Sequence, residues 1–119
     1  MLLYHYSNED LEVIDPKHFG SSHTPFSAIP RSYYYLNPDY KEKFFLGARF
    51  RYTVGIDHRK IYDCLFDDKG LFSRYSLDDF LNKIKKLGYI GFLFKLPNNH
   101  EIVCLFNAQK PIKKEVFNE

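Results

Sequence analysis

Tryptophan is absent from this sequence, methionine occurs once, and there are only two cysteines in 119 residues. Two cysteines are too few for the disulfide framework of a small secreted scaffold. Both lie in apolar runs, so we predict buried, reduced thiols at Cys64 and Cys104, with a single bridge between them as the open alternative. No run approaches the roughly 18 apolar residues of a membrane span, and no basic region precedes an apolar one at the N-terminus. We therefore expect a cytoplasmic protein without a membrane partner.

The motifs of several common enzyme classes are also missing. The chain has no Gly-rich phosphate loop, no HExxH, no paired CxxC and no GxSxG. Its five histidines and two cysteines do not show metal-ligand spacing, so we expect no metal site. The net charge is +2, from 17 basic and 15 acidic residues, which is too balanced to predict nucleic-acid binding from electrostatics.

Aromatic residues, in contrast, are abundant: 12 Phe and 10 Tyr together make 18% of the chain. Such residues suit strands and cores, and tyrosine also lines sites where flat ligands stack. The hydrophobic fraction of 45% and the charged fraction of 27% are those of an ordinary globular protein. Repeats, low-complexity tracts and linkers are lacking, so we predict a single domain over residues 1–119.

Hydrophobic periodicity predicts a sheet protein with few helices. The clearest element is a helix over 76–88, capped by Ser76 and ended by Gly88, whose apolar face comprises Leu77, Phe80, Leu81, Ile84 and Leu87. A shorter helix is expected within 38–47. Strands are expected within residues 2–6, 31–36, 48–56, 60–66, 89–96 and 101–107, with a last edge strand in 111–118. Because strands and helices do not alternate strictly, the predicted fold class is α+β, with two or three helices.

Three features could carry chemistry. His5 lies in the strand LLYHYS between two tyrosines that face the other way, and taken alone this pattern is more typical of a core histidine. The triple tyrosine at 33–35 sends its middle ring to the opposite face from the other two, which favours at least one tyrosine near water or a ligand. Glu101 begins an apolar strand. A carboxylate there is usually a solvated edge residue, but it is also where a sheet can hold a rigid acid beside a cleft.

The order of these features resembles the ADP-ribosyltransferase fold, in the branch whose motif residues are His, Tyr and Glu. The early His strand of that fold is matched by LYHYS, the Tyr strand before a short helix by YYYLNPDYKEKF, and the late acid strand by HEIVCLF. A Gly-Tyr-x-Gly element before the penultimate strand is matched by GYIGF. Over nearly its full length the chain is similar to small phage- and mobile-element-associated domains of this type, through LYHYS, VIDPKHFG, RSYYY, IYDCLFDDKGL and GYIGF.

The resemblance implies split, mostly antiparallel β-sheets that enclose an NAD cleft, with two or three short flanking helices. It implies that His5 hydrogen-bonds a ribose hydroxyl or the nicotinamide amide, and that Tyr34 stacks on the nicotinamide ring. Glu101 would hydrogen-bond the 2′-hydroxyl of the nicotinamide ribose and stabilise the positive charge that develops at its anomeric carbon. Tyr33 or Tyr35 would take the stacking role if the register slips by one residue.

The same resemblance implies further NAD contacts. A second stacking ring is expected from the helix after the tyrosine strand, where Tyr40, Phe44 and Phe45 compete. His23 and Arg31 are candidates for contact with the pyrophosphate, although a solvated loop histidine and a surface arginine explain them at least as well.

The activity implied is an NAD-dependent ADP-ribosyltransferase, of the glycosyltransferase class, acting on a protein or nucleic-acid acceptor. Arginine is disfavoured as the acceptor, because the arginine-specific branch carries E-x-E where this chain has Asn99-His100-Glu101. The small size leaves acceptor recognition to the loops of the catalytic domain or to a partner protein. A toxin or anti-defence role would fit the phage-related likeness.

Two other functions stay open. The fold could belong to a catalytically silent binding or inhibitor protein, which is expected if His5, Tyr34 and Glu101 do not converge on one cleft. A small nucleic-acid-processing toxin could instead use His5 and His100 as acid and base. That function requires both imidazoles within hydrogen-bond reach of one scissile phosphate.

Overall fold

The computed structural model describes residues 1–16, 31–37, 48–95 and 100–117. In them, seven strands form one sheet in the order β4-β5-β6-β2-β1-β3-β7. The strands are β1 (Leu2–Ser7), β2 (Ser32–Tyr35), β3 (Phe50–Gly55), β4 (Ile61–Asp63), β5 (Gly91–Lys95), β6 (Glu101–Leu105) and β7 (Lys113–Val116). The described helices are η3, a 3₁₀ turn (His58–Lys60), α3 (Leu71–Arg74) and α4 (Leu77–Lys86). The predicted α+β class is confirmed, and neighbouring strands are antiparallel except β4 and β5.

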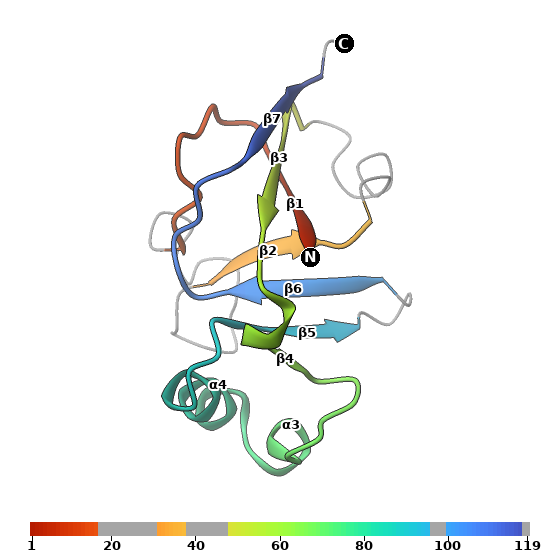
Figure 1. Cartoon of the computed structure of the whole chain (residues 1–119), viewed down its shortest axis with the longest axis vertical. Helices are drawn as coiled ribbons and strands as arrows, with labels where there is room; N and C mark the ends of the chain where they lie inside the picture. Colours follow the sequence, from red (N-terminus) through yellow and green to blue (C-terminus); the bar gives the residue numbers. More distant parts are fainter. Residues whose placement is uncertain (17–30, 38–47, 96–99, 118–119) are drawn as a thin grey trace.

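The sheet has two parts that meet at a narrow junction. β1 registers with β3 through six residue pairs, but with β2 only through Tyr4 and Tyr35. Figure 1 shows β1, β3 and β7 following the long axis of the molecule, whereas β2, β6 and β5 run across it. We call these the three-stranded part (β1, β3, β7) and the four-stranded part (β2, β6, β5, β4).

Side chains alternate across the sheet, so each face has its own apolar cluster. One face packs against α4, and we call it the α4 face. Its cluster includes Tyr35, Phe92, Ile102 and Cys104 from the sheet, with Phe80, Leu81 and Ile84 from the helix. The opposite face, which we call the His5 face, has a cluster that includes Leu3, Tyr34, Phe50, Tyr52, Val54, Val103 and Leu105.

The helix α4 forms as the sequence predicts. The hydroxyl of Ser76 accepts a hydrogen bond from the amide of Asp79 at 3.4 Å. Gly88 closes the helix with φ of +93°, a left-handed conformation that glycine adopts without steric cost. Leu87, predicted on the buried face, is 57% exposed and follows the last residue of α4. The other predicted apolar positions pack against the sheet.

The sequence did not predict α3, which depends on one aspartate. Asp67 accepts hydrogen bonds from the backbone amides of Phe72 at 3.0 Å and Ser73 at 3.1 Å, and from the hydroxyl of Tyr62. These contacts satisfy amides at the helix start, which have no partner within the helix. The hydrogen bond from Tyr62 is the main reason that the pKa of Asp67 falls to about 2.

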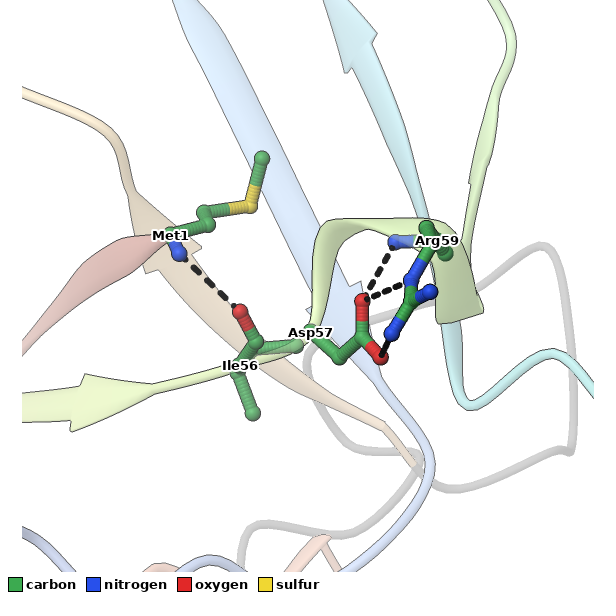
Figure 2. Close-up of polar contacts among 4 residues, drawn as sticks. All are labelled: Met1, Ile56, Asp57 and Arg59. Atoms are coloured by element: carbon green, nitrogen blue, oxygen red, sulfur yellow. Dashed lines mark hydrogen bonds and ion pairs between the residues drawn. The ribbon is translucent and has the colours of Figure 1, made fainter.

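The ends of β1 and β3 are tied together by the first residue. The ammonium group of Met1 donates to the carbonyl oxygen of Ile56 at 3.1 Å, and the amide of Ile56 donates to the carbonyl of Met1 at 2.9 Å. Immediately after, Asp57 caps η3 by accepting from the backbone amide of Arg59 and forms an ion pair with its guanidinium at 3.0 Å (Figure 2). The Met1–Ile56 pair extends the register of β1 on β3, in which His5 pairs with Tyr52.

Both cysteines, Cys64 and Cys104, are buried and free, as predicted. Burial raises the pKa of Cys64 to about 12, so its thiol stays protonated near pH 7. None of the described helices is long and apolar enough to cross a membrane. The helix predicted within 38–47 lies outside the described residues, as do the proposed ligand contacts His23, Tyr40, Phe44 and Phe45.

Candidate active site

His5, Tyr34 and Glu101 lie on β1, β2 and β6, which are neighbours in the sheet. Tyr34 pairs with Val103, and both residues belong to the cluster on the His5 face. Glu101 precedes Val103 by two residues on β6, so its side chain points to the same face. The ring centroids of His5 and Tyr34 are 5.4 Å apart. The structure therefore places the three motif residues on one face.

The main chain holds His5 in one orientation. Its Nδ1 lies 2.8 Å from the carbonyl oxygen of Tyr33. Because a carbonyl can only accept, Nδ1 carries the proton of the neutral ring, and Nε2 keeps its lone pair. Burial lowers the pKa of His5 below its ordinary value of 6.5, against a smaller opposing effect of the bond to Tyr33. His5 is thus a neutral imidazole near pH 7 that can accept a hydrogen bond at Nε2.

Tyr34 is completely buried, in the same cluster as Leu3, Tyr52 and Val103. Its hydroxyl has no hydrogen-bond partner among the described residues. Burial raises the pKa of Tyr34 well above 10, so the hydroxyl stays protonated and can donate. A buried hydroxyl without a partner costs about 1–3 kcal/mol. Since none of the ring is exposed, stacking on nicotinamide would require the ring face of Tyr34 to be uncovered.

Glu101 is half-buried at the first position of β6, opposite Lys95 of β5. Its carboxylate therefore stands at the border between the core and solvent, at the end of a rigid strand. His100, which the nuclease alternative combines with His5, immediately precedes β6 and is also half-buried. Alternation along β6 places Glu101 on the His5 face. His100 precedes the strand, so the same alternation does not place its side chain.

The other predicted NAD contacts of this region lie on the opposite side of the sheet. Tyr33 and Tyr35 pack against the cluster of the α4 face. Arg31 is buried, with 5% of its surface exposed, and its guanidinium lies 5.9 Å from the centre of the Tyr33 ring. It also interacts with Cys104 of β6. A ligand on the His5 face would thus lie on the same side of the sheet as Tyr34, the middle tyrosine of the triple. Tyr33, Tyr35 and Arg31 would be on the other side of the sheet from such a ligand.

Sequence reasoning missed an open pocket of about 480 Å³ near β7. Tyr52, which pairs with His5 across β1 and β3, lies at this pocket. We call it the β7 pocket; its lining includes Leu11, Tyr52, Ile112, Lys110, Lys113 and Lys114. The available signal was the lysine-rich stretch KPIKK, but short basic runs are usually solvated and do not by themselves indicate a pocket.

Comparison with known proteins gives no further guide: no family model matches this chain, and neither curated proteins nor solved structures give a significant match.

The buried imidazole of His5 predicts a pH dependence of stability. Its pKa is lower in the folded state than the ordinary 6.5 of the unfolded chain, so the unfolded chain binds more protons between these two values. The contribution of His5 is complete above about pH 6.5 and is lost as the pH falls through the folded-state pKa. Urea unfolding at a series of pH values will show this dependence. His5→Asn should weaken it, and an unchanged dependence would contradict the role of burial.

Proposed function

We propose that this protein is an NAD-dependent ADP-ribosyltransferase that modifies a macromolecular acceptor, a protein or a nucleic acid. The observation that supports the proposal is that His5, Tyr34 and Glu101, from three separate segments of the chain, lie on one face of adjacent strands.

Glu101 is suited to the central step. In the reaction, the bond between nicotinamide and the anomeric carbon of its ribose breaks, and the electron pair leaves with nicotinamide. The carbon becomes oxocarbenium-like, and a fixed carboxylate close to it lowers the barrier. The acceptor then forms the new bond to this carbon and loses a proton. Because Glu101 is half-buried on a strand, its carboxylate is held in a defined position. The exposed part of the side chain leaves the carboxylate accessible to a bound NAD.

His5 and Tyr34 would bind and orient NAD. The neutral ring of His5 can accept a hydrogen bond from a ribose hydroxyl at Nε2, because Nδ1 is held by the carbonyl of Tyr33. The hydroxyl of Tyr34 can donate to a ligand oxygen, which would satisfy a group that lacks a partner among the described residues. We place the NAD cleft at the junction of β1 and β2, where the two parts of the sheet separate after one registered pair.

The burial of Tyr34 favours a second candidate, a binding or inhibitor protein that keeps the fold without catalysis. An enclosed Tyr34 ring packs as a core residue and has no exposed surface for nicotinamide. In that case His5 would also be structural, as the histidine–carbonyl bond alone would suggest.

The test is to measure NAD binding by calorimetry and nicotinamide release from NAD, with and without cell lysate. ADP-ribosyltransferase function is expected to give binding and release, together with transfer of label from the adenosine half of NAD to protein or nucleic acid. If neither binding nor release occurs, the transferase proposal is wrong and the binding function replaces it.

A further inference from the structure

An NAD molecule bound on the His5 face needs a partner for its negatively charged pyrophosphate. Of the two residues predicted to contact it, Arg31 lies beside Tyr33 on the other side of the sheet, and His23 lies outside the described residues. The carboxylate of Glu101 would repel the pyrophosphate, because both groups are anions. A cation beside Glu101 would offset this repulsion.

Lys95 is such a cation. It is the last residue of β5 and the only lysine or arginine in the four strands β2, β4, β5 and β6. Lys95 pairs with Glu101 of β6, so the two side chains leave the sheet on the same face. The Cβ atoms of residues directly opposite each other in an antiparallel pair are about 4.5–5.5 Å apart. Figure 1 shows the end of β5 and the start of β6 at the same edge of the sheet.

The ammonium group of Lys95 is available to a ligand. The residue is exposed, and within the parts of the chain that the structure describes it forms no ion pair with Glu101 or any other carboxylate. On the adjacent strand β4, the carboxylate of Asp63 is engaged by the amides of Leu65 and Phe66, at 2.9 Å and 3.3 Å. The flexible stem of a lysine lets its ammonium group turn toward an anion that arrives from solvent.

We propose that Lys95 binds a phosphate group of the substrate whose ribose lies at Glu101. The inference rests on the proposed function and adds a phosphate contact to the same site. In NAD the pyrophosphate is attached to the 5′-carbon of the nicotinamide ribose, and the 2′-hydroxyl of that ribose is the expected partner of Glu101. The two groups are thus separated by one ribose ring, a span that a lysine opposite the glutamate is long enough to cover. A phosphate of a nucleic-acid acceptor is the other source of the same chemistry.

Two ligands that differ only in a phosphate test the contact with NAD. Nicotinamide mononucleotide carries the 5′-phosphate, and nicotinamide riboside lacks it. In calorimetric or NMR titrations, Lys95→Gln should weaken binding of the mononucleotide by about tenfold, because a charge-assisted hydrogen bond is lost, and should leave binding of the riboside unchanged. Lys95→Arg keeps the charge and should retain most of the affinity. The matched control is Lys86→Gln, the same change at an exposed position of α4, which packs on the opposite face.

Cleavage of NAD gives a second readout. Lys95→Gln should raise the KM for nicotinamide release by about tenfold and change kcat little, because the phosphate contact is equally strong in the bound substrate and in the transition state. The affinity of the parent for NAD should also fall more steeply with added salt than that of Lys95→Gln, since salt screens an exposed charge pair. A lysine that only supported the strand would produce neither the dependence on the ligand phosphate nor the dependence on salt.

The parent and the variants separate this contact from the proposed function. If Lys95→Gln weakens only the transfer of label to nucleic acid and leaves NAD kinetics unchanged, the phosphate that Lys95 binds belongs to the acceptor. If the parent binds and cleaves NAD but Lys95→Gln behaves like Lys86→Gln with every ligand and acceptor, the phosphate contact is wrong and the transferase function stands. If the parent itself neither binds nor cleaves NAD, the transferase function and the phosphate contact both fail.

Discussion

Replacing Glu101 by Gln is expected to lower nicotinamide release from NAD by about 100-fold or more, which is the scale of losing a principal electrostatic contact to a transition state. The amide has the shape of the carboxylate but no charge, so it cannot stabilise the positive anomeric carbon. Because the 2′-hydroxyl can still bond to the amide, NAD affinity should change much less than the rate. Initial rates and calorimetric affinities for both proteins will measure the two effects separately.

The control for this substitution is Glu9→Gln, which makes the same chemical change at an exposed position outside the candidate site. It should leave the rate unchanged. Both variants should also keep the parent's free energy of unfolding within a few tenths of a kcal/mol, since neither glutamate lies in the core. If Glu101→Gln releases nicotinamide as fast as Glu9→Gln, Glu101 is a strand-edge residue and the proposed site is wrong.

Gly91→Ala is expected to cause the largest loss of stability, about 3 kcal/mol or more. Gly91 begins β5 and pairs with Leu105 of β6. A Cβ atom there would lie 2.0 Å from the carbonyl oxygen of Cys104 and 2.8 Å from Cδ2 of Leu105. The first contact is with backbone in the middle of the four-stranded part, which cannot rotate away. Relief would require β5 and β6 to separate, and that would disturb the strand that carries Glu101.

Gly55→Ala provides the matched control, because a Cβ atom at Gly55 would meet no atom within 4 Å and the residue is exposed at the end of β3. Its free energy of unfolding should stay within about 0.5 kcal/mol of the parent. Urea titration followed by circular dichroism will compare the three proteins. Equal stability of the two alanine variants would show that β5 can shift without cost.

The local elements of this fold were accessible from the sequence. The capped, amphipathic pattern of residues 76–88 gave α4 with its buried face, and alternation correctly put Tyr34 on the opposite face from Tyr33 and Tyr35. These features depend on neighbouring residues and on the fixed periods of helix and strand, so a single sequence contains the information.

Features that depend on distant residues were not accessible in the same way. The short helix α3 forms because Asp67 meets Tyr62 and two amides, a set that no periodicity indicates. The complete burial of Tyr34 depends on residues of four strands, and the separation of the sheet between β1 and β2 depends on how strands cross. The second glycine of GYIGF was noted only as a motif, and the structure supplies its reason in the close approach of Cys104.

The order of the strands also has a consequence for synthesis on the ribosome. The chain places β1 in the three-stranded part, β2 in the other part, β3 in the first again, then β4 to β6 in the second, and β7 finally in the first. Neither part is built from strands that follow one another directly in the chain. The aromatic strand β2 is synthesised early, but all four of its residues pair with β6, which is synthesised much later. The edge of β2 that pairs with β6 therefore stays unpaired until β6 is made. Such long-range pairing makes folding slow and exposes apolar edges meanwhile, so the nascent chain should depend on chaperones until β6 and β7 have emerged.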